Sequence, residues 1–277
     1  MRNFTFKGAF LAMLFMLFGC LSLYAADDDL ITKQITIKLE APGTLPDSIG
    51  SSKKYKITNL KIVGEINGKD WRMIRDMAGG TYDITGNTLE HSSGKLSKLD
   101  LSEAIMVEDH ENAYANFFVW KDLYVTNRET IPDYIFSKCS SLQEINFPSY
   151  IKSIGEGAFY RSGLTSVNIP FSVTEIVKGA FTDCRSLTSI SIPSSVTEIG
   201  TWAFSDCSSL TSISIPYSVT KIGSGAFQSC SSLTSVSIPS GVTKIGNYTF
   251  EYCSSLTSVN IPSSVTEIGK CAFYDCI

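Results

Sequence analysis

The sequence predicts an α/β solenoid in which each 23-residue coil contributes one short parallel strand and returns through a short helical or turn segment. The first observation behind this prediction is a run of near-identical units in the second half of the chain, of which 207–227 is a clear copy. The second is the spacing, which is 23 residues apart from one 22-residue unit at Ser162. A fixed short period is typical of stacked repeats and not of a globular catalytic domain. One column of the repeat is Phe136, Phe159, Phe181, Phe204, Phe227, Phe250 and Phe273.

Residues 1–26 are predicted to form a secretory signal peptide. Basic residues precede an apolar run over 8–23, and small residues then lead to an acidic segment. The run is short for a membrane span, so we expect a protein that is secreted or held at the outer cell surface. Cys20 ends a segment similar to a bacterial lipoprotein box, and a lipid on this residue would be the expected membrane contact. Cleavage near Ala25 or Ala26, which discards Cys20, is the alternative.

Residues 27–115 are predicted to form an N-terminal cap with divergent repeats, because a solenoid must close its open apolar end. Apolar residues alternate with polar ones over 31–39, as in a half-buried strand. The segments 57–62 and 96–101 have the apolar spacing of the regular units, which indicates two early coils. Between them, Asp70 is expected to cap a short helix that a glycine pair ends.

The regular repeats are predicted to occupy residues 116–277. In one unit, the segment 187–192 is rich in β-branched residues, and Pro193 ends it because proline cannot continue a hydrogen-bonded ladder. The segment after Gly200 has apolar residues at roughly helical offsets, which suits a helical or turn return.

Stacking turns each column of the repeat into a ladder along the solenoid. We expect the Leu, Ile, Val, Phe, Ala and Cys ladders to point inward and the Ser and Thr ladders of the strand to point outward. Opposite charges at neighbouring positions of one outward ladder would form exposed ion pairs that contribute little to stability. The charged ladder is Glu175, Glu198, Lys221, Lys244 and Glu267.

Neither the composition nor the motifs of the chain indicate an enzyme. The net charge of -4 and the lack of a basic stripe argue against a nucleic-acid partner. His91 and His110 both lie outside the regular repeats, and the serines recur at ladder positions without a Gly-x-Ser-x-Gly elbow. No phosphate-binding glycine loop and no Cys-x-x-Cys zinc motif occurs. We therefore expect no catalytic residues, no cofactor and no metal.

The cysteines of the repeat carry the core period, so we expect small buried side chains with free thiols. Neighbouring coils would nevertheless bring the Cα atoms of these cysteines near the separation that a disulfide tolerates. Geometry alone therefore does not forbid a disulfide such as Cys207 to Cys230. Cys271 lies off the column and is the better candidate for reactivity.

The unit at 184–204 resembles the leucine-rich repeats of BspA-like surface proteins of Bacteroidetes and some protozoan parasites. The segments 56–68 and 94–102 also look like the N-terminal part of such proteins. The resemblance covers most of the chain after the signal peptide, and it implies a leucine-rich repeat stack that binds or adheres and carries no catalytic residues. The sequence ends at Ile277, two residues into a new unit, so we expect the chain to be shortened or its last coil to pair with another molecule.

The positions that vary between copies are left for recognition, and several of them are aromatic. Exposed aromatic side chains suit protein interfaces and sugar stacking, although packing against neighbouring coils is a plainer use for them. The candidate ligand-binding residues are Tyr160, Phe171, Trp202, Tyr217, Tyr248, Tyr252 and Tyr274.

Two functions of different class follow. The first is an exported, non-enzymatic binding or adhesion protein that recognises host or cell-surface proteins or glycans. The second is a structural surface scaffold that self-associates through its C-terminal coil.

Overall fold

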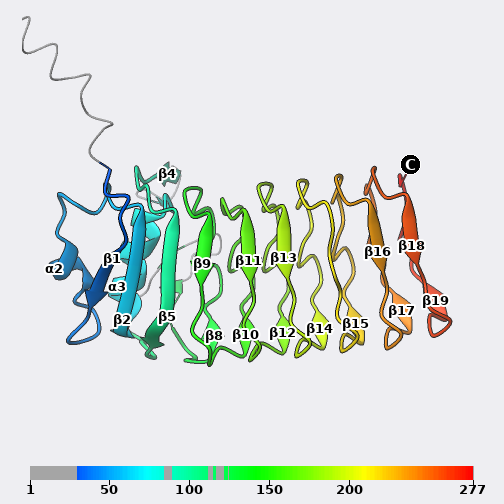
Figure 1. The fold of residues 1–277 in the computed structure, drawn as a ribbon, viewed down its shortest axis with the longest axis horizontal. Coiled ribbons are helices and arrows are strands. Elements are labelled where there is room, and N and C mark those ends of the chain that lie inside the picture. Colours follow the sequence, from blue (N-terminus) through cyan, green and yellow to red (C-terminus); the bar gives the residue numbers. More distant parts are fainter. Residues whose placement is uncertain (1–29, 84–88, 112–114, 117–121, 124, 277) are drawn as a thin grey trace, which may run out of the picture.

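The structure is a computed structural model that describes residues 30–83, 89–111, 115–116, 122–123 and 125–276. The predicted signal peptide, with Cys20, lies outside these residues. The coils follow one another along a single axis, as Figure 1 shows. The predicted solenoid of parallel strands is confirmed.

The stack begins with a parallel sheet whose strands come from the N-terminal region, which we define as residues 30–111. The strand expected near Ile35 pairs with the first divergent coil, where Ile35 lies opposite Leu60. Leu60 in turn lies opposite Leu99, and Leu99 lies opposite Ile145 of the regular repeats. Both predicted early coils are therefore in register with the regular ones. The strands, in their order across the sheet, are β1 (Ile35–Lys38), β2 (Asn59–Ile66), β5 (Lys98–Met106) and β9 (Glu144–Asn146).

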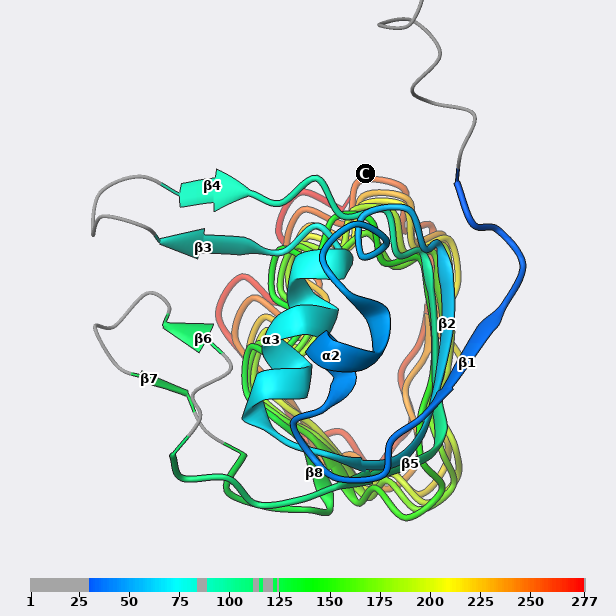
Figure 2. The same ribbon diagram turned by 90° about the vertical axis from the view of Figure 1, so that its left-hand side faces the viewer.

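Two helices, α2 (Leu45–Ile49) and α3 (Gly68–Met77), lie across the end of the stack. Viewed along the axis in Figure 2, both helices fall inside the outline of the coils. Trp71 of α3 packs edge-on against Phe136, the first ring of the core column, with centroids 5.7 Å apart. The helices thus cover apolar surface that a solenoid end would otherwise expose.

The prediction that Asp70 is the helix N-cap is wrong by three residues. Asn67 is the N-cap, and its side chain accepts a hydrogen bond from the Lys69 backbone at 3.0 Å. Asp70 sits at the third helical position and accepts from the Asn67 backbone N–H at 3.0 Å, which completes a capping box. Asn also caps well, and an acidic residue three positions later reaches back to it.

Two short antiparallel hairpins lie outside the outline of the coils in Figure 2. The first hairpin lies in the predicted cap and the second lies at the start of the predicted repeats, and neither was predicted from the sequence. The strands are β3 (Thr81–Asp83) with β4 (Leu89–His91), and β6 (Ala115–Asn116) with β7 (Asp122–Leu123).

The regular coils carry the expected strand in the Leu-x-x-Ile-x-Ile segment, except for the coil at 210–215, where the segment forms no strand. In each of these strands an apolar residue lies between two polar ones, as Ile190 does in β13, and it is buried in all of them except β18, where Val259 is half-buried. Serine and asparagine side chains therefore form much of the outer surface. After β9 the strands of this ladder are β11 (Ser166–Asn168), β13 (Ser189–Ser191), β16 (Ser235–Ser237) and β18 (Ser258–Asn260).

Each coil adds a second, two-residue strand that the sequence reading did not predict. These strands come from the Val-Thr-x-Ile segment, whose β-branched residues suit an extended backbone. Within residues 125–276 the return segments are turns, and none of them forms a helix. The second ladder comprises β8 (Thr130–Ile131), β10 (Ser153–Ile154), β12 (Glu175–Ile176), β14 (Glu198–Ile199), β15 (Lys221–Ile222), β17 (Lys244–Ile245) and β19 (Glu267–Ile268).

The charged ladder points outward, as predicted, and it lies on these second strands. Glu198 pairs with Lys221 at 2.5 Å, and Lys244 pairs with Glu267 at 2.7 Å. All four side chains are at least one third exposed, so these pairs contribute little to stability.

The core phenylalanines form a continuous stack from Phe136 to Phe273. Neighbouring rings lie nearly parallel, with centroids 5.2 to 5.5 Å apart. On the same side the backbone N–H of each core Phe from Phe136 to Phe250 bonds to the next coil, as from Phe204 to the Ala226 carbonyl at 2.8 Å. Ring stacking and backbone hydrogen bonds therefore join the coils on the return side, where no strand runs among the described residues.

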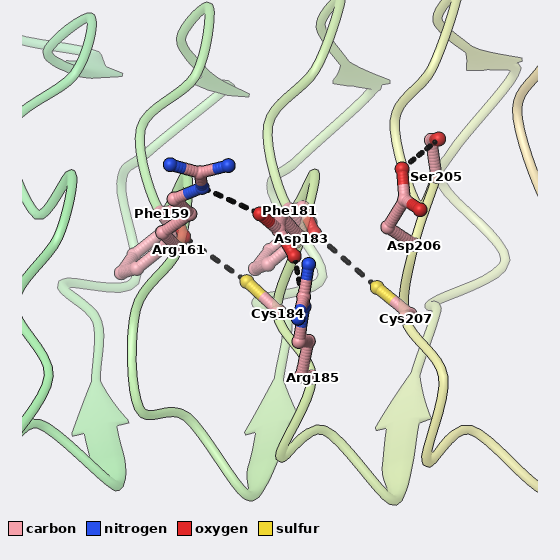
Figure 3. A network of polar contacts seen from close by, with 9 residues as sticks. All are labelled: Phe159, Arg161, Phe181, Asp183, Cys184, Arg185, Ser205, Asp206 and Cys207. Atoms are coloured by element: carbon pink, nitrogen blue, oxygen red, sulfur yellow. Dashed lines mark hydrogen bonds and ion pairs between the residues drawn. The ribbon is translucent and has the colours of Figure 1, made fainter. Parts of the chain in front are cut away.

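The seven described cysteines are free, which agrees with the prediction of free thiols. From Cys184 onward, each column thiol donates to the carbonyl oxygen of the core Phe in the preceding coil, as from Cys207 to Phe181 at 3.2 Å (Figure 3). Burial raises the pKa of Cys184 and of Cys253 from 9.0 to about 12. Cys271, off this column, is only half-buried.

Candidate binding site

One outward ladder departs from the regularity of the core. It lies two residues before each core Phe, and every residue on it has a φ between 53° and 64°. This left-handed conformation favours glycine, yet only three of the seven residues on this ladder are glycines and three are aromatic. We call it the turn ladder, and its members are Tyr134, Gly157, Gly179, Trp202, Gly225, Tyr248 and Cys271.

Two aromatic rings of the turn ladder lean over the glycine of the following coil. A Cβ on Gly157 would lie 2.2 Å from Cε1 of Tyr134, and a Cβ on Gly225 would lie 2.3 Å from Cδ1 of Trp202. Real Cβ atoms do not approach other atoms so closely, so the rings occupy space that only glycine leaves open. Each ring therefore packs closely against the glycine of the next coil, and any larger residue at that position would displace the ring.

Gly179 has no such covering ring, because the preceding ladder position is Gly157. Among the described residues, the sole atom within 4 Å of a Cβ on Gly179 would be Oγ1 of Thr182, at 3.4 Å. A hollow of about 440 Å³ opens here between Tyr134 and Trp202. We call this hollow the Gly179 slot.

The rim of the Gly179 slot is polar and carries both charges. The Tyr134 hydroxyl donates to the Glu156 carboxylate at 3.0 Å, and the Lys178 ammonium pairs with the same carboxylate at 2.9 Å. Burial and the hydrogen bond to Glu156 raise the pKa of Tyr134 to about 12, so its phenol stays protonated at neutral pH. Tyr160, Ser205 and Gln228 complete the rim.

The structure brings together only some of the predicted aromatic residues. Tyr160 and Trp202 line the Gly179 slot, and Trp202 is 45% exposed. Tyr248 lies on the turn ladder beyond Gly225, is half-buried and does not line the slot.

The remaining candidates lie elsewhere. Tyr252 and Tyr274 contact each other edge to face, with centroids 5.7 Å apart. Phe171 and Tyr217 are the most exposed, at 76% and 81%, and both follow the prolines that end the first strands.

Sequence reasoning missed Tyr134, Gly157 and Gly179 as residues of the site. Their shared column was visible in the sequence, but the lean of each ring over the next coil is a property of the folded chain. The signal that could have found them is the presence of both aromatic residues and glycines in the column two residues before each core Phe.

A second hollow, also about 440 Å³, lies where the 22-residue unit interrupts the period. Its two arginines, Arg161 and Arg185, both bind the buried Asp183 carboxylate at 2.5 Å, as Figure 3 shows. Ser162 replaces the column cysteine there, and its hydroxyl lies 3.5 Å from the Cys184 thiol. The polar network thus fits the shortened coil into the stack.

Within the described ranges, no group of three or more His, Cys, Asp or Glu side chains is placed to hold a metal ion. In the same part of the chain, neither helix is long and apolar enough to cross a membrane.

Comparisons with known proteins agree with this architecture. The chain is 30% identical to the leucine rich repeat protein TpLRR of T. pallidum, over 65% of this chain and 77% of that one, with a TM-score of 0.52. A leucine-rich repeat protein from Bacteroides ovatus shares the fold at 20% identity, with a TM-score of 0.51, over 80% of this chain and 53% of that one. A search of curated proteins returns no match.

The family comparison covers most of the stack. The model of the BspA type leucine rich repeat region, which contains six copies of the repeat, matches residues 110–228 and 152–277. The chain therefore belongs to the family of BspA type leucine rich repeat proteins.

Proposed function

We propose that this chain is an exported, non-enzymatic binding protein that recognises a protein or glycan at a host or other cell surface through the Gly179 slot. The observation that carries the proposal is the uncovered glycine between two aromatic residues on a ladder that elsewhere covers its glycines. Export is supported by the predicted signal peptide over 1–26.

The slot combines features that ordinary solenoid surface lacks. Its aromatic walls, Tyr134 and Trp202, supply apolar contact area at low cost in side-chain entropy. Its rim supplies a cation at Lys178, an anion at Glu156 and an amide at Gln228 for orienting a ligand. The core residues beneath are buried and hydrogen-bonded from coil to coil, so the walls are held on a rigid support.

The proposal is tested by probing an array of host matrix proteins and mucin-type glycans with the purified chain lacking 1–26. We expect binding that changes little with salt and that is lost in Trp202→Ala. Tyr217→Ala is the matched control, because it removes a more exposed aromatic residue that does not line the slot.

The outcome also separates the two functional classes. Binding that survives Trp202→Ala unchanged, or no binding on the array, would contradict the slot as the binding site. Concentration-dependent assembly in light scattering without any ligand would instead favour the structural scaffold.

A further inference from the structure

We propose that the Gly179 slot receives the ring of a tyrosine side chain presented by a partner protein. This inference rests on the proposed binding function and narrows the partner from a protein or glycan to an exposed tyrosine. The other two glycines of the turn ladder are each covered by an aromatic ring of the preceding coil.

The chain covers an outward glycine on this ladder with a flat ring on both sides of the slot. The Tyr134 ring covers Gly157, with Cε1 and Cδ1 at 2.2 and 2.5 Å from a Cβ placed there. The Trp202 ring reaches Gly225 in the same way, with Cδ1 and Nε1 at 2.3 and 2.5 Å. Gly179 has the same backbone conformation, with φ +64° against +56° at Gly157 and +63° at Gly225. A third ring therefore fits the surface that Gly179 presents.

The coil spacing suits such a ring. Stacked core rings of successive coils have centroids 5.2 to 5.5 Å apart on the same side of the solenoid. A ring seated on Gly179 would lie one coil beyond the Tyr134 ring, which covers Gly157. A distance of one coil between the centroids of the two rings falls within the roughly 4.5–7 Å range at which aromatic pairs attract each other.

The rim favours a phenol over a plain phenyl ring. The Tyr134 hydroxyl is held by Glu156, the residue immediately before the glycine that its ring covers. Lys178 immediately precedes Gly179, and its side chain is 52% exposed beside Glu156. A tyrosine seated in the same pose places its hydroxyl oxygen beside Lys178, from which it accepts a hydrogen bond. A pyranose ring is thicker than a phenol ring and carries hydroxyl groups around its edge, so it matches less well a surface that a flat aromatic ring covers at Gly157 and at Gly225.

The experiment uses the chain lacking 1–26 and the peptide acetyl-Gly-Gly-Tyr-Gly-Gly-amide, with Phe and Leu analogues and chitotetraose as the glycan probe. The readout is the Trp202 indole N–H signal in ¹H–¹⁵N spectra, assigned with Trp202→Phe. We expect a saturable shift with the Tyr peptide, a weaker one with the Phe peptide and none with the Leu peptide. Lys178→Met is expected to abolish the preference for Tyr over Phe.

Gly179→Ala is the decisive variant, because its Cβ takes the space of the ring edge. The left-handed backbone tolerates a side chain here, since Tyr134 and Trp202 adopt it on the same ladder. We expect Tyr-peptide affinity to fall by about tenfold or more. Tyr248→Ala is the control, because it places an alanine on the same ladder at a φ of 60° and Tyr248 does not line the slot. Thermal unfolding of both variants checks that they fold.

An equal Tyr-peptide shift in Gly179→Ala and in the unmodified chain would overturn the inference. A shift with chitotetraose and none with the Tyr peptide would also overturn it, while leaving the proposed binding function in place. Array binding that does not depend on Trp202 would remove that function itself, so the two failures are distinguishable.

Discussion

The N-terminal region and the regular coils reach a closed core by different means. In the N-terminal region, single buried polar side chains hold several segments together. Asp70 is fully buried and accepts backbone N–H groups from Gly43 at 2.6 Å and Leu45 at 2.9 Å, in addition to Asn67 of the capping box. Arg75 of α3, 5% exposed, donates to the backbone carbonyl oxygens of the first regular coil, with Tyr134 at 2.8 Å.

The regular coils instead repeat the same modest interactions many times. Each contributes a stacked Phe, a buried Leu and short backbone ladders to its neighbours, and beyond the first of them the described polar side chains join mainly neighbouring coils, as Asp183 does for Arg161. Stability is then close to a sum of neighbour terms. Outward positions that the ladders do not need are free to vary, and the Gly179 slot lies at such positions.

The largest effect is expected in the middle of the core stack. Phe204 is fully buried between Phe181 and Phe227, with centroids 5.4 and 5.5 Å away. Phe204→Ala should lower the free energy of unfolding by about 3–5 kcal/mol, because it removes buried surface and leaves a cavity. Urea unfolding followed by circular dichroism measures this, and a loss near zero would show that the coils do not depend on the stack.

A somewhat smaller loss is expected for Asp70→Ala, about 2–3 kcal/mol, because the buried backbone donors lose their acceptor. The same unfolding measurement applies, with Asp47→Ala on the exposed face of α2 as the control. A loss no greater than that of the control would contradict the difference drawn between the two regions.

Alkaline pH is expected to weaken the regular coils through their buried thiols. The folded-state pKa of Cys184 is about 12, raised by burial from the 9.0 of an ordinary thiol. The unfolded chain therefore releases this proton at a lower pH than the folded chain does. Stability is full below about pH 9 and declines as the pH rises towards 12.

Thermal melts between pH 8 and 11 test this dependence. Cys184→Ala should flatten the decline, and an unchanged slope in that variant would contradict the assignment to the thiol. At pH 8, alkylation of the folded chain should reach half-buried Cys271 before any fully buried column cysteine.

The smallest effect is expected on the charged ladder. Lys221 is 66% exposed at its ion pair with Glu198, so Lys221→Ala should leave the melting temperature unchanged within error. A clear drop that disappears at high salt would show that this ladder stabilises the stack.

The regular repeat could be predicted closely from the sequence because each column has one packing environment. The Phe, Leu and Cys columns report burial directly. The second strand was missed because two hydrogen-bonded residues leave no periodic signal of their own. Asn67 was overlooked in favour of Asp70 because both are good capping residues, and only the folded backbone shows which one is the N-cap.

The site was harder to predict for a related reason. Trp202 and Tyr160 were identified as outward aromatic residues, but the hollow between them is defined by what is absent at Gly179. Tyr134 precedes the most regular units, so its position in the same column as Trp202 is less evident from the sequence. Which glycine a ring covers depends on its side-chain torsions, which the column does not encode.

The central claim is that the constant ladders form the fold while the interrupted turn ladder forms the binding site. The most direct test measures unfolding and array binding together for Trp202→Ala and Tyr217→Ala. We predict that both variants keep the melting temperature of the unmodified chain and that only Trp202→Ala loses binding. Equal binding by the two variants, or loss of binding in Trp202→Ala only because it unfolds, would contradict the claim.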